Sequence, residues 1–227
     1  MEIKHALILV TNAGSLLGRT IALHFAKLGA TIILSDQNKA QLAETQTMLA
    51  TITDKACSIA ICDDQTETIQ RLFAEIEQQF AQVPDVLVNC WTSLPLPSLT
   101  DHAADGGFVE QLSSTAGALY RFGQVCAERM RHTETKGVIV NVITHADYQN
   151  FSGVESVTSL VSGFTHSWAK ELTPFNIRVG GVIPALSHTQ NHVDEAHWAQ
   201  VQDELIRNTE YIVANEYFSG RVVSAEV

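Results

Sequence analysis

Three side chains able to take part in acid–base chemistry lie close together past the middle of the chain. Thr144, His145 and Tyr148 follow directly after an apolar run, 138–143, with the sequence VIVNVI. An imidazole or a phenol can pass a proton to or from a carbonyl oxygen, so His145 and Tyr148 are candidate general acids. Both also fit an ordinary surface loop after a strand, and we favour that interpretation because loops run over protein surfaces.

Three histidines form a second group of residues with possible chemistry. His188 and His192 are four residues apart, and His197 follows them. On a helix the first two would share one face and could bind zinc. No acidic or cysteine partner stands at a matching spacing, so we expect no metal site.

These side chains need a scaffold, and the chain alternates short β-branched runs with longer amphipathic stretches. The apolar runs predict seven strands, at 6–11, 31–34, 58–61, 86–88, 138–143, 177–183 and 221–223. Apolar residues at helical spacing predict helices at 17–28, 69–80, 112–130 and 157–172. Asp64 and Glu67 have the spacing of a capping box before the second of these helices.

The predicted strands are apolar almost throughout, which is typical of strands covered by helices on both faces. We therefore expect an α/β fold in which residues 1–227 form a single doubly wound domain, with a seven-stranded parallel sheet flanked by helices. Such folds bind ligands at the carboxyl ends of their strands.

Composition narrows the classes of function. Of 227 residues, 45% are hydrophobic and 17% are charged, which is a globular composition. The net charge of -11 disfavours nucleic-acid and membrane partners. We read the N-terminal residues as a first strand rather than a signal peptide, and we expect a cytoplasmic protein. We expect reduced thiols at the four cysteines, which form no C-x-x-C pair: Cys57, Cys62, Cys90 and Cys126.

Three segments resemble motifs of the short-chain dehydrogenase/reductase (SDR) family. Residues 11–18 (TNAGSLLG) resemble its glycine motif T-G-x-x-x-G-x-G, and residues 85–92 (DVLVNCWT) resemble D-x-L-V-N-N-A-G. Residues 163–184 resemble G-L-T-x-x-L-A-x-E-L-x-P-x-x-I-R-V-N-x-V-x-P almost without gaps. The likeness extends from residue 6 to about 223. It implies a Rossmann-type fold and, in ordinary members, an NAD(P)-dependent oxidoreductase.

The resemblance also implies where a cofactor would lie. Asp36 matches the carboxylate that holds the adenosine ribose and prefers NAD, and Asp63 matches an adenine contact; both also fit as loop openers or caps. Leu16 and Trp91 are large where the family is small, and we expect both side chains to occupy space that a dinucleotide needs. We therefore expect no cofactor, or NAD if any. The positions implied for cofactor binding are Thr11, Asn12, Gly14, Gly18, Asp36, Asp63, Asn89 and Pro184.

The catalytic positions implied by the resemblance are mostly substituted. Counting back from the matched segment 163–184 places Val154 at the family's tyrosine and Thr158 at its lysine, and Ser114 falls at a family asparagine. Only Thr144 retains a family hydroxyl. The reaction needs a phenol that transfers a proton and a cation that lowers the pKa of that phenol. The segment between Pro184 and the last strand also indicates a curtailed substrate lid.

Two interpretations follow. We favour a non-catalytic binding, regulatory or assembly subunit with an unknown small-molecule ligand. The alternative is an NAD(P)-dependent oxidoreductase with a rebuilt site, in which Thr144 acts with Tyr148 or His145 on a small carbonyl or alcohol. We expect a homodimer or homotetramer through the two long helices, 106–131 and 153–172. The reason is that the second helix carries apolar residues over a wide arc, namely Val154, Val157, Val161, Phe164 and Trp168.

Overall fold

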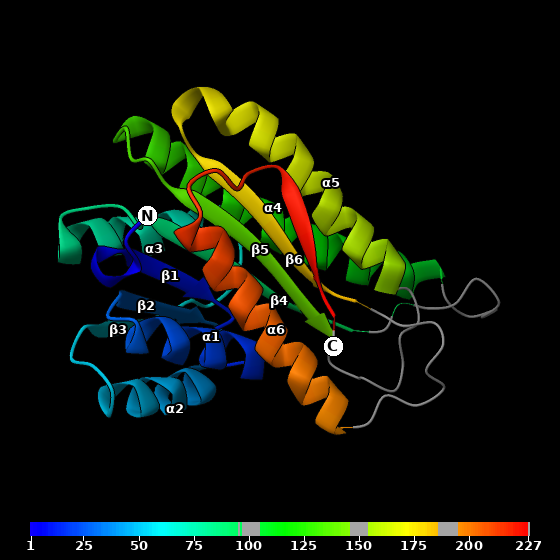
Figure 1. The fold of residues 1–227 in the computed structure, drawn as a ribbon, viewed down its shortest axis with the longest axis horizontal. Helices are drawn as coiled ribbons and strands as arrows, with labels where there is room; N and C mark the ends of the chain where they lie inside the picture. The colour runs from blue at the N-terminus through cyan, green and yellow to red at the C-terminus, as the bar shows by residue number, and fades with distance from the viewer. Residues whose placement is uncertain (95, 97–104, 146–153, 186–194, 227) are drawn as a thin grey trace.

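The computed structural model describes residues 1–94, 96, 105–145, 154–185 and 195–226. Within these residues, seven strands form one parallel sheet in the order β3-β2-β1-β4-β5-β6-β7 (Figure 1). This confirms the predicted seven-stranded doubly wound fold. The strands are β1 (Leu7–Thr11), β2 (Thr31–Asp36), β3 (Ala56–Ala60), β4 (Val86–Ser93), β5 (Val138–His145), β6 (Arg178–Pro184) and β7 (Arg221–Ala225).

Helices cover both faces of the sheet. Helices α1, α2 and α6 lie on one face and α3, α4 and α5 on the other (Figure 1). They are α1 (Leu16–Lys27), α2 (Lys39–Ala50), α3 (Thr66–Phe80), α4 (Asp105–His132), α5 (Val154–Leu172) and α6 (Glu195–Ala214), with short 3-10 helices η1 (Ile3–His5) and η2 (Thr173–Phe175). None of the described helices is long and apolar enough to span a bilayer.

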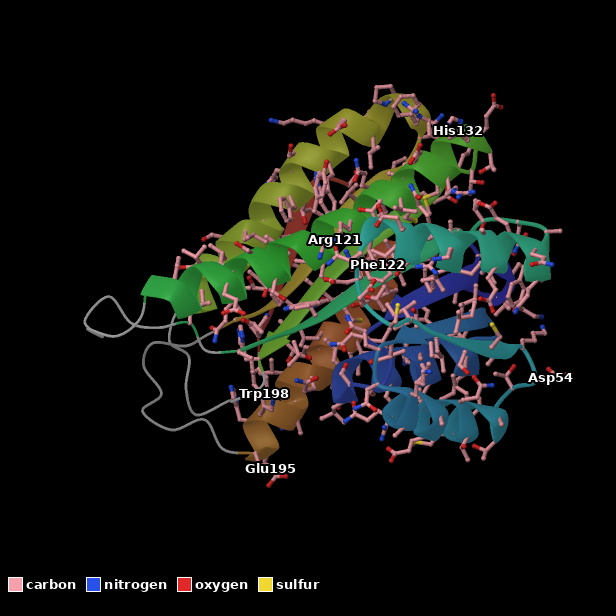
Figure 2. All side chains as sticks on the ribbon, turned by 180° about the vertical axis from the view of Figure 1, so that it is seen from behind. Asp54, Arg121, Phe122, His132, Glu195 and Trp198 are labelled. Carbon is pink, nitrogen blue, oxygen red and sulfur yellow. The ribbon has the colours of Figure 1, made fainter. Side chains whose placement is uncertain are left out.

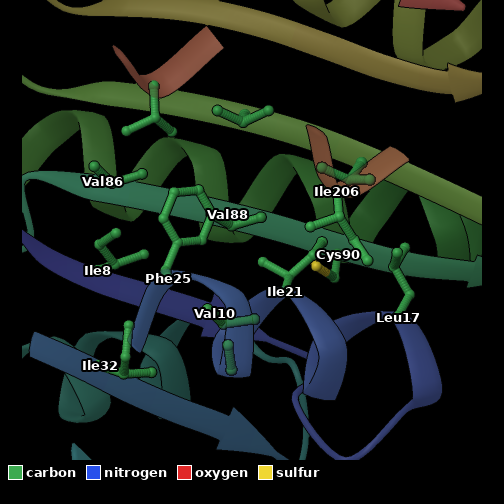
Figure 3. Packing of buried hydrophobic residues seen from close by; sticks show 14 of the residues in the cluster. Ile8, Val10, Leu17, Ile21, Phe25, Ile32, Val86, Val88, Cys90 and Ile206 are labelled. Atoms are coloured by element: carbon green, nitrogen blue, oxygen red, sulfur yellow. The ribbon is translucent and has the colours of Figure 1, made fainter. Parts of the chain in front are cut away.

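Alternating strand residues supply the two cores. In β1, Ile8 and Val10 join the cluster under α1 and α6, whereas Leu7 and Leu9 join the cluster under α3 and α4. Figure 3 shows the first cluster, in which Phe25 of α1 lies over the strands. Each such fully buried side chain contributes roughly 1.5–3 kcal/mol, so the sheet is fixed from both sides.

Two helices were missing from the sequence prediction. Helix α2 has few apolar positions, with only Leu42, Thr45 and Leu49 buried, so its periodicity is weak. Helix α6 occupies most of the segment that we expected to be a shortened lid. Its buried face packs on the sheet and on α1 through Val201, Leu205, Ile206, Thr209, Ile212 and Val213. This segment is therefore mainly a core element, and only residues 186–194 lie outside the description.

The predicted capping box before α3 is wrong. The helix begins at Thr66, and its N-cap residue Gln65 makes no side-chain capping hydrogen bond. Asp64 instead pairs with Arg121 of α4, Nη2 to Oδ2 at 2.7 Å. The acidic residue before α3 thus links two parts of the fold rather than capping a helix.

Part of the apolar arc of α5 is covered within the chain itself. Val157, Val161 and Trp168 are at most 9% exposed, packed against the sheet and α4. These three residues therefore need no cover from another molecule, whereas Phe164 is only half-buried.

Candidate functional site

A cleft lies at the carboxyl ends of β1, β2 and β4, where the strand order reverses direction. Its volume is about 540 Å³, within the roughly 300–1,000 Å³ typical of ligand pockets. The lining runs from the start of α2 to the end of β4 and the adjoining part of α4. It consists of Thr11, Asn12, Ser15, Asp36, Gln37, Asn38, Gln41, Ile61, Asp64, Asn89, Cys90, Trp91, Thr92, Leu94, Ala118 and Phe122.

The turn between β1 and α1 holds one end of this cleft. Asn12 has φ of 50°, the left-handed conformation that asparagine tolerates better than most residues. Ser15 is the N-cap of α1, and its hydroxyl accepts a hydrogen bond from the Gly18 amide at 3.1 Å. A Cβ on Gly18 would lie 2.3 Å from the Asn12 carbonyl oxygen, so only glycine allows this close packing.

Leu16 does not enter the cleft. Its side chain is 69% exposed on the first turn of α1, and it is absent from the lining. The expectation that Leu16 would intrude is therefore wrong. The reason is that Ser15 starts the helix in a direction that turns position 16 toward solvent.

Asp36 at the end of β2 is a buried carboxylate in the wall of the cleft. Its Oδ2 accepts from the Gly14 amide at 2.8 Å, and its Oδ1 accepts from the Asn38 amide at 2.7 Å. It is 7% exposed. These bonds fix its orientation, and each carboxylate oxygen retains capacity to accept a further hydrogen bond.

The sequence suggested Asp63 as an adenine contact and Asp64 as part of a helix cap, but the structure places Asp64 rather than Asp63 in the lining of the cleft. Asp64 lines the cleft, paired with Arg121, which lies beside Phe122 on α4 (Figure 2). Asp63 is outside the lining and accepts from the Gln65 amide at 3.0 Å. A hydrogen bond from Thr68 and this amide lower the pKa of Asp63. Asp63 therefore shapes the turn before α3.

Thr11 and Asn89 line the cleft but hold the sheet together. The Thr11 hydroxyl accepts from the Cys90 amide at 3.0 Å. The Asn89 amide donates to the Leu119 carbonyl at 3.0 Å and to Asn141 Oδ1 at 3.2 Å. These bonds join β1, β4, β5 and α4. Thr11 and Asn89 therefore stabilise the sheet and its contact with α4, whether or not a ligand binds.

Trp91 of β4 is one of the residues that line the cleft. Its indole Nε1 donates to the Thr115 hydroxyl of α4 at 3.0 Å. Its ring also packs against a cluster that includes Ile143 of β5 and Val157 of α5. Trp91 therefore stands between the cleft and the first turns of α5. Thr115 was missed by the sequence reasoning, which chose its neighbour Ser114; Ser114 is exposed in the structure.

At the end of β5, helix α6 contacts both candidate residues that the structure describes. The buried Thr144 hydroxyl accepts from Gln202 Nε2 at 2.8 Å. The buried His145 ring stacks on Trp198, with centroids 6.3 Å apart, and burial lowers the pKa of His145 to about 4. Trp198 lies near the start of α6 (Figure 2). His145 is thus a core residue rather than a loop residue.

The remaining predicted positions are spread around this edge of the sheet. Val154 and Thr158 are one turn apart at the start of α5, and the Thr158 hydroxyl donates to the Glu155 carbonyl at 3.1 Å. Pro184 is buried at the end of β6, beside Ala225 of β7. Gly14 and Gly18 support the β1 turn without lining the cleft. Tyr148, His188 and His192 lie outside the described residues.

No group of three potential metal ligands occurs in the described part of the chain, which includes His197. The four cysteines are free thiols, as expected. Burial raises the pKa of both Cys90 and Cys126, so neither is a reactive thiolate.

Comparisons with known proteins agree with this architecture. A family model described as short chain dehydrogenase matches residues 6–200, and the chain therefore belongs to the short-chain dehydrogenase family. A (3R)-3-hydroxyacyl-CoA dehydrogenase of Canis lupus familiaris is 24% identical over 202 residues, covering 83% of this chain and 76% of that protein. A diacetyl reductase [(S)-acetoin forming] of Staphylococcus epidermidis is 27% identical over 224 residues, covering 93% and 80%.

Solved structures show the same fold. The crystal structure of a short chain dehydrogenase from Mycobacterium smegmatis matches with a TM-score of 0.81 at 23% identity, covering 100% of this chain and 93% of that one. A short-chain type dehydrogenase/reductase from Mycobacterium marinum matches with a TM-score of 0.81 at 17% identity, covering 99% and 96%. Family members typically use NAD(P) and commonly form homo-oligomers.

The described lining of the cleft offers positions for part of such a cofactor. In such folds a carboxylate at the end of β2 holds a ribose and the turn after β1 receives the diphosphate, and Asp36, Asn12 and Ser15 occupy these positions in the lining. Its described lining includes no residue of β5 or β6, and its only charged members are the carboxylates Asp36 and Asp64. A diphosphate would meet no lysine or arginine among these residues.

Proposed function

We propose that this chain is a non-catalytic member of the short-chain dehydrogenase family, which uses the fold for ligand binding and assembly. The observation that carries the proposal is that Val154 and Thr158 stand in place of the phenol and the cation that the reaction needs. Thr144 pairs in register with Thr92 of the cleft lining, and its hydroxyl accepts a hydrogen bond from Gln202 of α6. The surviving hydroxyl therefore lies next to the cleft without these two family partners.

The chemistry of α5 supports the same proposal. Val154 has no proton to donate, and Thr158 carries no positive charge to lower the pKa of a neighbouring acid. Loss of a positioned general acid typically costs about 10²- to 10⁴-fold in rate. His145 does not replace it well, because its lowered pKa of about 4 leaves the ring neutral near pH 7.

The proposal is tested by following oxidation of NADH and NADPH with a panel of small ketones, aldehydes and diketones. The expected result is a rate equal to that without protein. The competing function, an oxidoreductase with a rebuilt site, is favoured by the retained hydroxyl of Thr144. It requires a measurable rate that falls in Thr144→Val and persists in Ser113→Ala, a control on the exposed face of α4.

Assembly is the second part of the proposal. A groove of about 320 Å³ between α4 and α5 carries the exposed aromatic residues Tyr120 and Phe175, which are 45% and 41% exposed. Glu128, Glu171 and Arg131 place both signs of charge in the same groove. A surface with both charges can pair with its own copy about a two-fold axis. We propose a homodimer or homotetramer through this groove, in the cytoplasm.

A further inference from the structure

We propose that two copies of this chain pair through antiparallel contact of their α4 helices, with Tyr120 at the two-fold axis and Glu110 of each copy against Arg131 of the other. The inference rests on the assembly part of the proposed function, because it names the partner, a second copy, and fixes how that copy docks. Three features of α4 carry it: an exposed stripe, opposite charges at the two ends of the stripe and an aromatic residue at its middle.

The stripe is a row of side chains on the outer face of α4, which runs beside α5 along the surface of the molecule (Figure 2). Its members are three and four residues apart in turn, so they lie on one face of the helix. Each member is exposed or half-buried, whereas the opposite face of α4 is buried against the sheet. The stripe consists of Glu110, Ser113, Gly117, Tyr120, Gln124, Ala127 and Arg131.

Charge is divided between the two halves of α4. Between positions 107 and 120 the helix carries one charged side chain, Glu110, whereas the rest of α4 carries three arginines and one glutamate. Two of the arginines already pair within the chain, with Asp64 and Glu77. Glu110 and Arg131 are exposed, and neither has an ion pair with another residue that the structure describes. Helix α4 therefore offers one uncommitted charge of each sign, at opposite ends of the stripe.

The positions of these two charges fix how the second copy lies. A helix rises about 1.5 Å per residue, so Glu110 and Arg131 lie roughly 16 Å on either side of the midpoint of the stripe. A two-fold axis through that midpoint sets the two α4 helices antiparallel and brings Arg131 of one copy level with Glu110 of the other. The same arrangement places Glu128 opposite the uncharged Ser113. Opposite charges thus meet at both ends, which specifies the docked orientation.

Tyr120 lies within one residue of the midpoint and is 45% exposed. Its ring contacts Phe164 and Trp168 of α5, with ring centroids 6.5 and 6.3 Å apart, so it is held at the rim of the groove. The residues that dominate binding energy cluster near the centre of an interface and are enriched in tyrosine. In this arrangement the groove also faces the first half of the partner's α4, where Val109 is 62% exposed.

The test exchanges the two charges. Glu110→Lys sets a lysine against Arg131 at both ends of the interface, and Arg131→Glu sets a glutamate against Glu110. Each variant alone should therefore dimerise at least about tenfold more weakly than the unaltered chain. In an equimolar mixture, a heterodimer of the two variants has opposite charges at both ends, so it should form with an affinity near that of the unaltered chain. Native mass spectrometry, with one variant labelled with 15N, measures the heterodimer.

Asp54→Lys is the matched control, because Asp54 is an exposed carboxylate in the loop before β3, outside the groove, and should leave dimerisation unchanged (Figure 2). Circular dichroism checks that each variant is folded, as expected for exposed positions. Single variants that dimerise as the unaltered chain does, or a mixture that stays monomeric, overturn this inference. If Tyr120→Glu dissociates the dimer in the same case, the groove is an interface and only the pairing of charges is wrong. A monomeric unaltered chain overturns the assembly part of the proposed function as well.

Discussion

At the scale of the residue, His145 is a side chain capable of acid–base chemistry that the fold buries in its core. Its position after an apolar run suggested a surface loop, but pairing between β4 and β5 extends through His145, and Trp198 covers its ring. Burial disfavours the charged imidazolium and lowers the pKa of His145 to about 4 from its ordinary value near 6.5. The ring has become part of the core beneath α6.

This lowered pKa predicts a pH-dependent stability. The unfolded chain binds a proton at His145 near pH 6.5, but the folded chain does so only near pH 4, so stability is full above 6.5 and falls as the pH drops toward 4. The contribution is about 2–3 kcal/mol between pH 7 and 4.5. Urea unfolding at both pH values should therefore show a smaller pH effect in His145→Gln than in the unaltered chain. The exposed control His132→Gln should keep the full effect, and equal pH effects in all three proteins would rule out the buried neutral ring.

At the scale of the element, the β1 turn and α1 are fitted together by one glycine. Gly18 lies against the Asn12 carbonyl and the Ala13 backbone, and Ser15 caps the helix from the same turn. The turn therefore keeps the packing function of the family's glycine motif, although two of its glycine positions hold Asn12 and Leu16. Conservation of shape in this element does not require that a diphosphate bind there.

A pair of glycine substitutions tests this packing. Gly18→Ala places a methyl group 2.3 Å from the Asn12 carbonyl oxygen, so α1 must shift, at a cost of about 1–3 kcal/mol in the free energy of unfolding. Gly163→Ala on α5 meets no atom within 4 Å and should raise stability by roughly 0.5–1 kcal/mol, because alanine favours helix. Denaturant unfolding of both variants measures the contrast. Equal stabilities would show that Gly18 is not closely packed.

At the scale of the whole molecule, the sequence predicted the sheet well and the site less well. The central strands are apolar on both faces, so the parallel pairing of the sheet followed from local pattern. The position of helix α6 was not predicted, because the family resemblance suggested a substrate lid in that segment. The contacts of Trp91 with Thr115, and of Thr144 with Gln202, join residues far apart in the chain. No local spacing indicates such pairs, and choosing between Asp63 and Asp64 required the actual start of α3.

The proposed oligomer is a property of the whole molecule and can be tested at its groove between α4 and α5. Tyr120→Glu or Phe175→Glu places a charge in the groove between α4 and α5 and should convert the proposed oligomer to monomer. Tyr217→Glu is the matched control, since Tyr217 is 95% exposed and does not line the groove. Light scattering after size-exclusion chromatography gives the masses. A monomeric unaltered chain at high concentration, or variants that stay associated, would exclude this interface.

We propose that this chain does not pass a proton and a hydride to a carbonyl. The most direct measurement is transfer of deuterium from C4-labelled NADH and NADPH to a carbonyl panel, with protein in excess of cofactor and products analysed by mass spectrometry. We expect no deuterated alcohol beyond that formed without protein. Deuterated alcohol that disappears when Thr144 is changed to valine would contradict it.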